Sequence, residues 1–130
     1  MDNDEIPANV RSFLNDHIES VVQVEVLLLL YGHTAESFDA AAVARELRIE
    51  PAGAETQLAN LRARNILADA AAGRYHYRPQ TPDLDAAVAG LARAYADRRV
   101  TIIGMIYSKP TDQLRSFADA FRIRKDKGNG

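Results

Sequence analysis

The sequence predicts a mainly α-helical fold that includes one small β-hairpin. Apolar residues recur at three- and four-residue spacing on both sides of the middle of the chain, which is the period of an amphipathic helix. The middle itself, residues 38–78, contains two short helical stretches. Two short runs that suit β-strands follow them around an alanine-glycine tip. Helices are therefore expected to flank a central unit that ends in a hairpin.

The N-terminal part is expected to form two helices. Pro7 suits the first turn of the first helix, because its missing N–H costs nothing there. The apolar face of this helix consists of Val10, Phe13, Leu14 and Ile18. Residues 20–31 are apolar almost all round, and the alternation over residues 22–26 is also compatible with a strand. We favour a buried central helix, because residues 27–30 are not β-branched and Gly32 suits a helix end.

The central unit begins with two helices joined by a tight turn. Asp39 is expected to cap a small helix over residues 40–47. The turn at residues 48–50 leads to a second helix over residues 51–64, which begins with a proline, and Asn65 breaks it. This spacing predicts a helix-turn-helix.

A hairpin is expected to follow. Ile66 and Leu67 begin its first strand, and its tip lies at residues 70–73. On the return strand Tyr75 and Tyr77 share one face, and the other face carries Arg74, His76 and Arg78. Ser37 and Phe38 allow a further strand of one or two residues. Two helices followed by such a hairpin predict a winged helix-turn-helix, which usually places one helix in the DNA major groove and the hairpin beside it.

Residues 83–108 read as one long helix. Its apolar positions follow a heptad-like rhythm through Leu84, Val88, Leu91, Tyr95, Ile102 and Met105. At about 1.5 Å per residue this helix would span roughly 39 Å, longer than a small winged domain needs. Arg98 occupies a slot where an apolar residue is expected, and a kink near Arg98 and Arg99 stays open. A short terminal helix over residues 110–121 and a basic tail complete the chain.

These elements divide the chain into three parts. Residues 1–36 form N-terminal helices, residues 37–79 the winged helix-turn-helix, and residues 80–130 the C-terminal helices with the basic tail. This architecture resembles the MarR type of bacterial regulator, in which two leading and two trailing helices pack against their copies in a dimer. The resemblance covers about residues 7–121. The long wing of that family, with its paired acidic and basic residues, is absent from this sequence.

The resemblance implies a homodimeric, DNA-binding transcriptional regulator that acts on double-stranded DNA. The expected dimer interface consists of Leu84, Val88, Leu91, Tyr95, Ile102, Leu114, Phe117 and Phe121. Ligand-responsive regulators also often hold a small-molecule pocket between helices, although aromatic residues at helical spacing are more often core.

Composition narrows the functional classes. The chain has no cysteine, which excludes a disulfide framework, a thiolate metal site and a cysteine nucleophile. Residues 1–5 are acidic and lack the order of a signal peptide, and the apolar run over residues 26–31 is too short to cross a bilayer. We therefore expect a cytoplasmic protein without a membrane span. Residues 1–50 hold ten acidic and three basic residues, whereas residues 51–130 hold eight acidic and 13 basic residues, which is compatible with phosphate contacts.

Nine side chains are candidates for DNA contacts: Arg45, Arg48, Thr56, Asn60, Arg62, Arg64, Arg74, His76 and Arg78. Thr56, Asn60 and Arg62 suit base edges, because they lie on or beside the outer face of the second helix. The cationic wing face suits a phosphate track or a minor-groove edge, but it equally suits an edge strand that charge protects from pairing.

Alanine in the middle of the outer face of the second helix leaves a second function open. Ala52, Ala59 and Ala63 surround Thr56 there, whereas a helix that reads bases usually presents Arg, Lys, Asn or Gln. The alternative is a non-enzymatic adaptor that binds a partner protein, with the alanine face docking a partner helix.

The sequence offers no catalytic constellation. His17, His33 and His76 lie in three different elements without the spacing of metal ligands. The glycines form no phosphate-binding loop, and no Ser, His and Asp set suggests a nucleophile elbow or triad. We therefore expect no enzymatic activity and no cofactor.

Overall fold

The computed structural model describes residues 6–108, which form six helices and one two-stranded antiparallel sheet. In chain order these are α1 (Ala8–His17), α2 (Val21–Tyr31), α3 (Ala40–Leu47), α4 (Pro51–Ala63), β1 (Leu67–Asp69), β2 (Tyr75–Tyr77), α5 (Pro82–Asp97) and α6 (Arg99–Ser108). The predicted class, mainly α with a small β-wing, is confirmed. No helix within residues 6–108 is long and apolar enough to cross a membrane.

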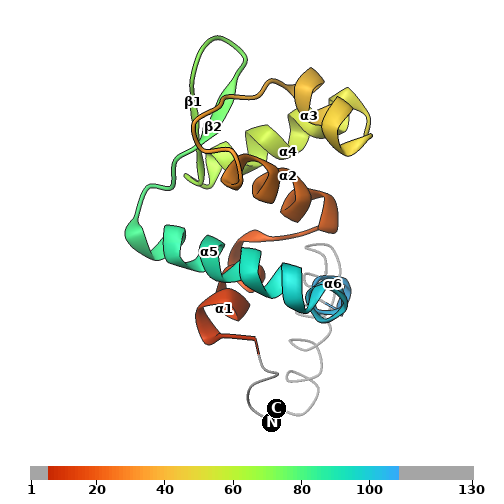
Figure 1. Ribbon diagram of the computed structural model, residues 1–130, viewed down its shortest axis with the longest axis vertical. Coiled ribbons are helices and arrows are strands. Elements are labelled where there is room, and N and C mark those ends of the chain that lie inside the picture. The colour runs from red at the N-terminus through yellow and green to blue at the C-terminus, as the bar shows by residue number, and fades with distance from the viewer. Residues whose placement is uncertain (1–5, 109–130) are drawn as a thin grey trace, which may run out of the picture.

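The described chain has two lobes with α2 between them (Figure 1). One lobe holds α3, α4 and the hairpin, and the other holds α1, α5 and α6. Helix α2 packs on α3, α4 and β2 on one side and on α5 on the other. Its residues Val24, Val26, Leu27 and Leu30 have no exposed surface. Burial on several faces explains why this stretch is apolar almost all round, and the prediction of a central helix is confirmed.

Local capping sets the helix-turn-helix. The Asp39 carboxylate accepts a hydrogen bond from the amide of Ala42 at 2.8 Å and starts α3. Arg48 ends α3 in the left-handed region with φ 59°, and Pro51 opens α4 at a position that needs no N–H donor. Asn65, with φ 65°, turns the chain from α4 into the wing. Asn is one of the few side chains that adopts this conformation readily.

The wing is a short hairpin with one additional bridge. Leu67 pairs with Tyr77 and Asp69 with Tyr75, and Gly73 forms the tip with φ 71°. Phe38 forms a bridge with Tyr75 through two backbone hydrogen bonds of 2.8 Å each. The third strand expected at Ser37 and Phe38 is therefore one residue long.

The single helix expected over residues 83–108 is two helices, and the kink that the sequence left open near Arg98 and Arg99 is a complete break. The helix breaks at Arg98 (φ −137°, ψ 52°), and in Figure 1 α6 is seen nearly end-on while α5 lies across the view. The break turns α6 back onto the core, where Ile102 is fully buried. Glu25 of α2 holds the corner, because its carboxylate accepts hydrogen bonds from Tyr95 at 2.9 Å and Arg99 at 3.1 Å.

Of the five described side chains expected at a dimer interface, three lie inside the chain. Val88, Leu91 and Ile102 are fully buried in the single chain, so these three side chains offer no surface to a partner in this structure. Leu84 and Tyr95 are half-buried. Leu114, Phe117, Phe121 and the terminal helix over residues 110–121 lie outside the described residues. The heptad-like rhythm therefore reflects packing within the chain, where Gly90 of α5 lets α1 approach closely. A Cβ atom on Gly90 would come within 2.8 Å of Val10 Cγ2.

Candidate nucleic-acid interface

Helix α4 packs against α3, α2 and β1, and in Figure 1 it lies between α3 and the wing. One of its faces is exposed along its length. Ala54, Leu58 and Leu61 are fully buried against the core. The exposed residues of α4 are Pro51, Ala52, Gly53, Glu55, Thr56, Ala59, Arg62 and Ala63. The outer face is therefore low in relief, with short side chains at most positions.

The N-terminal half of this face carries two polar side chains. The Thr56 hydroxyl donates to the carbonyl of Ala52 at 3.0 Å, which leaves its oxygen free to accept a hydrogen bond. The Glu55 carboxylate accepts a hydrogen bond from the Tyr75 hydroxyl at 3.0 Å. Burial, together with this bond, raises the pKa of Tyr75 above its ordinary value. The wing is thus attached to the outer face of α4 through the phenol of Tyr75.

Arg62 lies on the outer face but is paired with the wing. Its guanidinium donates to both carboxylate oxygens of Asp69, at 2.9 and 3.1 Å, and both side chains are more than half exposed. The hydrogen bond to Asp69 raises the pKa of Arg62. A planar two-point pair of this kind fixes orientation. The pair uses Nε and Nη2 of Arg62, so its remaining N–H donors can contact a partner only in the orientation that Asp69 fixes.

Asn60 and Arg64, both expected to contact DNA, are engaged inside the protein. Asn60 Oδ1 accepts hydrogen bonds from Gln23 Nε2 at 2.9 Å and from Arg64 Nε at 2.7 Å. Arg64 also donates to the carbonyl of Asp16 at 3.1 Å and pairs with Glu19 at 3.2 Å. These bonds tie the C-terminal end of α4 to the junction of α1 and α2. In this structure Asn60 and Arg64 make anchoring contacts, and the DNA contacts expected of them stay a prediction.

Gln23 is a buried anchoring residue that the candidate set lacked. It is 1% exposed, and its amide bonds the carbonyl of His17, the amide of Glu19 and the side chain of Asn60. The sequence signal that could have identified Gln23 is a polar residue on an otherwise apolar helix, because a buried amide requires hydrogen-bond partners. Its partner on α4 lies 37 residues away in the sequence, so the pattern alone did not name it.

The cationic wing face does not form as expected. Arg74 precedes β2 and turns back, so that its guanidinium donates to the hydroxyl of Ser37 at 2.9 Å and to the carbonyl of Ser37 at 2.7 Å. It also pairs with Asp39 at 3.5 Å. Arg74 thus fastens the wing to the start of α3. His76 is half-buried opposite Ala68, and only Arg78 is well exposed.

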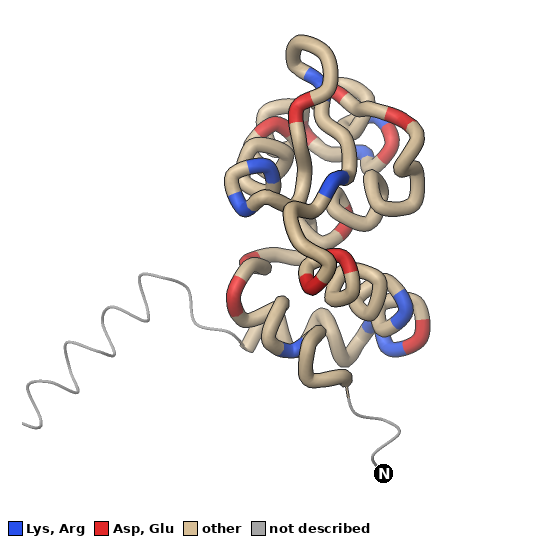
Figure 2. The backbone as a smooth tube through the Cα atoms, turned by 90° about the vertical axis from the view of Figure 1, so that its left-hand side faces the viewer, with Lys and Arg blue, Asp and Glu red and all other residues tan. Residues whose placement is uncertain are grey.

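Three of the candidate arginines remain available to a partner. Arg45, Arg48 and Arg78 are exposed, and within residues 6–108 no side-chain hydrogen bond or ion pair engages them. Arg45 lies on α3 and Arg48 at its end, whereas Arg78 follows the wing on the other side of α4. Residues 37–79 hold six arginines and five acidic residues. Acidic and basic positions interleave along the tube of this lobe (Figure 2). This lobe therefore attracts a negatively charged partner only locally, at Arg45, Arg48 and Arg78.

Within residues 6–108 no group of three or more His, Asp or Glu side chains is arranged to hold a metal ion. No family model matches this chain, and no curated protein matches it. The solved structure of MepR, a transcription regulator of the Staphylococcus aureus multidrug efflux pump MepA, is similar to this chain at a TM-score of 0.46 and 13% identity. The similarity covers 93% of this chain and 90% of that chain.

Proposed function

We propose that this chain binds double-stranded DNA through its winged helix-turn-helix and acts as a transcriptional regulator. In this proposal the N-terminal half of α4 enters the major groove, and Thr56 is its base-contacting side chain. Arg45 and Arg48 contact the phosphates on one side of α4, and Arg78 contacts them on the other. The low relief of the alanine face allows the close approach that groove binding requires.

The conformation of Arg48 is the observation that carries the proposal. Its φ of 59° costs a residue with a Cβ atom roughly 1 kcal/mol, and glycine is the usual residue at such a helix end. The guanidinium makes no bond to the described residues that would offset this cost. A strained backbone that presents a free cation beside a candidate reading helix favours a role for the side chain in binding.

Anisotropy with a pool of genomic DNA fragments, measured from low to physiological salt, tests the proposal. We expect selective binding in which log affinity falls linearly with log salt, by about 0.9 for each phosphate contact. Arg48→Gly should raise the free energy of unfolding by about 0.5–1 kcal/mol and reduce the salt slope by about 1. Arg93→Ala, which removes an exposed arginine of α5, serves as the control and should leave the slope unchanged.

We also place a twofold homodimer within this proposal. Val100 and Tyr107 of α6 are 83% and 78% exposed, and the sequence stretch that follows α6 carries a further apolar stripe. A twofold dimer would present two α4 helices about one turn of DNA apart and would favour an inverted repeat. Light scattering should give a particle mass twice that of one chain. A mass equal to that of one chain at micromolar concentration would contradict the dimer.

A protein-binding adaptor is the second candidate function. Two observations favour an adaptor: the alanines on the outer face of α4, and the near balance of acidic and basic residues over residues 37–79. The adaptor reading requires that no DNA fragment binds even at low salt. It also requires that Ala59→Glu abolishes capture of a protein partner, and unchanged capture would contradict it.

A further inference from the structure

The side chain of Arg62 reaches from α4 to the end of β1, where the Asp69 carboxylate holds its guanidinium. Nε donates to Oδ1 at 2.9 Å, and Nη2 donates to Oδ2 at 3.1 Å. Arg62 is 53% exposed and Asp69 is 62% exposed, so the pair lies at the surface and not in the core. Two parallel bonds fix the plane of the guanidinium as well as its position.

The pair leaves the outer fork of the guanidinium open. A guanidinium carries its N–H donors in one rigid plane and has no acceptor. Asp69 uses Nε and one donor of Nη2, so Nη1 and Nη2 still present a pair of N–H groups side by side at the tip of the side chain. Within residues 6–108 no hydrogen bond reaches Nη1. Arg62 is therefore fixed in orientation and still able to donate two parallel hydrogen bonds.

This arrangement distinguishes Arg62 from the free arginines of the interface. Arg45, Arg48 and Arg78 are exposed and are not held by the described residues, so each loses side-chain freedom when it binds. A phosphate carries no sequence information, and a loosely held cation is sufficient for it. A base edge accepts hydrogen bonds in its own plane, and a guanidinium whose plane is already fixed loses less freedom there.

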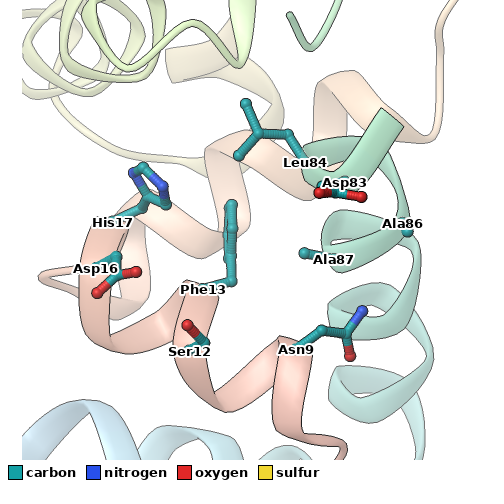
Figure 3. Close-up of a pocket in the computed structure, with 9 residues that line it drawn as sticks. All are labelled: Asn9, Ser12, Phe13, Asp16, His17, Asp83, Leu84, Ala86 and Ala87. Carbon is teal, nitrogen blue, oxygen red and sulfur yellow. The ribbon is translucent and has the colours of Figure 1, made fainter. Parts of the chain in front are cut away.

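Asp69 also differs from the exposed acids of the other lobe. Asp16 and Asp83 line a cleft between α1 and α5, and no lysine or arginine is among its lining residues (Figure 3). Asp69, by contrast, lies beside the helix proposed to enter DNA, where phosphates would repel an unpaired carboxylate. The pair with Arg62 reduces that repulsion and allows Asp69 to orient a donor.

Guanine is the base that matches an open guanidinium fork. In the major groove it presents two acceptors side by side, O6 and N7, whereas adenine and cytosine each present an amino donor there. We propose that Arg62 reads a guanine in the DNA site and that Asp69 is the positioning residue that sets the plane of its guanidinium. This inference rests on the proposed function and adds a base to it. Arg62 lies about 9 Å further along α4 than Thr56, which separates their bases by roughly three steps of about 3.4 Å.

Selection of duplexes from a random library, followed by anisotropy with single duplexes, tests the base. We expect the wild type to enrich a guanine at one fixed position, and adenine at that position should weaken binding about tenfold. Replacement by 7-deazaguanine, which lacks the N7 acceptor, should weaken binding about fivefold. Hypoxanthine keeps both O6 and N7 and should bind like guanine.

Three variants test the side chains. Arg62→Lys keeps the charge but loses the planar fork, so it should bind unselected library DNA like the wild type and prefer guanine over adenine by about twofold or less. Asp69→Asn keeps Arg62 but frees it, and its preference should fall about three- to fivefold. Arg93→Ala, which removes an exposed arginine of α5, is the control and should keep the full preference.

The outcomes separate this inference from the proposed function. A guanine preference that is unchanged in Arg62→Lys, or equal binding of 7-deazaguanine, would overturn the reading of guanine. Arg62→Ala that weakens all sequences equally and lowers the salt slope by about 1 would assign Arg62 to a phosphate and would also overturn it. Enriched duplexes without such a guanine would leave the proposed function standing, whereas a library without any enriched duplex would overturn both.

Discussion

At its N-terminal end α4 presents Thr56 and alanines to solvent, whereas at its C-terminal end Asn60 and Arg64 are bonded to the junction of α1 and α2. The two ends differ although both carry polar residues of the kind that contacts DNA. At the first end Glu55 is bonded to Tyr75 of the wing, but the Thr56 hydroxyl bonds within α4, to the carbonyl of Ala52, and stays exposed. The second end is occupied because a buried amide, Gln23, requires partners there. Residue type therefore indicates the chemistry that a position offers, and the packing around the position decides whether the protein itself already uses it.

The largest expected effect comes from removing the buried amide. Gln23→Ala leaves the amide of Glu19 and the carbonyl of His17 without their partner and opens a cavity. We expect the free energy of unfolding to fall by about 3 kcal/mol. Urea denaturation measures it, with Val22→Ala, a neighbour that is 40% exposed, as the control. Similar losses in the two variants would show that the C-terminal end of α4 is not anchored by Gln23.

A matched pair of variants compares the two ends directly. Asn60→Ala should lower the free energy of unfolding by about 1–2 kcal/mol, because Gln23 loses a buried partner. Thr56→Ala should leave it within about 0.5 kcal/mol, since alanine suits an exposed helix position. Although Thr56→Ala should stay as stable as the wild type, we expect it to bind DNA about fivefold more weakly. Unchanged DNA affinity in Thr56→Ala would remove Thr56 from the reading face.

A smaller effect is expected where the wing holds Arg62. Asp69→Asn removes the carboxylate that holds the guanidinium at 2.9 Å. Because both side chains are well exposed, stability should hardly change, and the released charge should raise the affinity for unselected DNA about two- to fivefold. Anisotropy at two salt concentrations measures the change. Weaker binding of unselected DNA by Asp69→Asn would contradict this prediction, because only the selected sequence gains from an oriented Arg62.

The smallest effect concerns the attachment of the wing to α5. Burial and the hydrogen bond to Asp85 raise the pKa of Tyr77. The unfolded chain ionises this phenol near pH 10, whereas the folded chain keeps it protonated, so its contribution to stability is complete below pH 10 and falls above it. The slope is at most about 1.4 kcal/mol per pH unit, and partial exposure reduces it. Tyr77→Phe should flatten the decline of the unfolding free energy above pH 10, and an unchanged decline would contradict this assignment.

Elements with local causes could be predicted from the sequence. The cap at Asp39, the opening of α4 at Pro51 and the turn at Asn65 depend on the residue and its neighbours, and the structure confirms each of them. Arg98 in an apolar slot marked the place of a possible kink, but the sequence could not decide for a break, because Glu25, more than 70 residues earlier, holds the corner through Tyr95 and Arg99.

The roles of the candidate site residues show the same limit. Arg45, Arg48 and Arg64 are equivalent in a sequence pattern, and each is a cation near the expected reading helix. Arg64 differs only because Asp16 and Glu19, some 45 residues away, accept its donors. Chain folding brings those partners together, and the spacing of residues along a helix does not predict such a long-range contact.

Amide chemical shifts with a selected DNA duplex test the central claim most directly. We expect the largest changes over residues 45–59 and at Arg78, with weaker changes at Asn60 and Arg64 and none over α5. Such a pattern would place DNA at the open end of α4. Changes concentrated on α5 and α6, with residues 45–59 unaffected, would contradict the account.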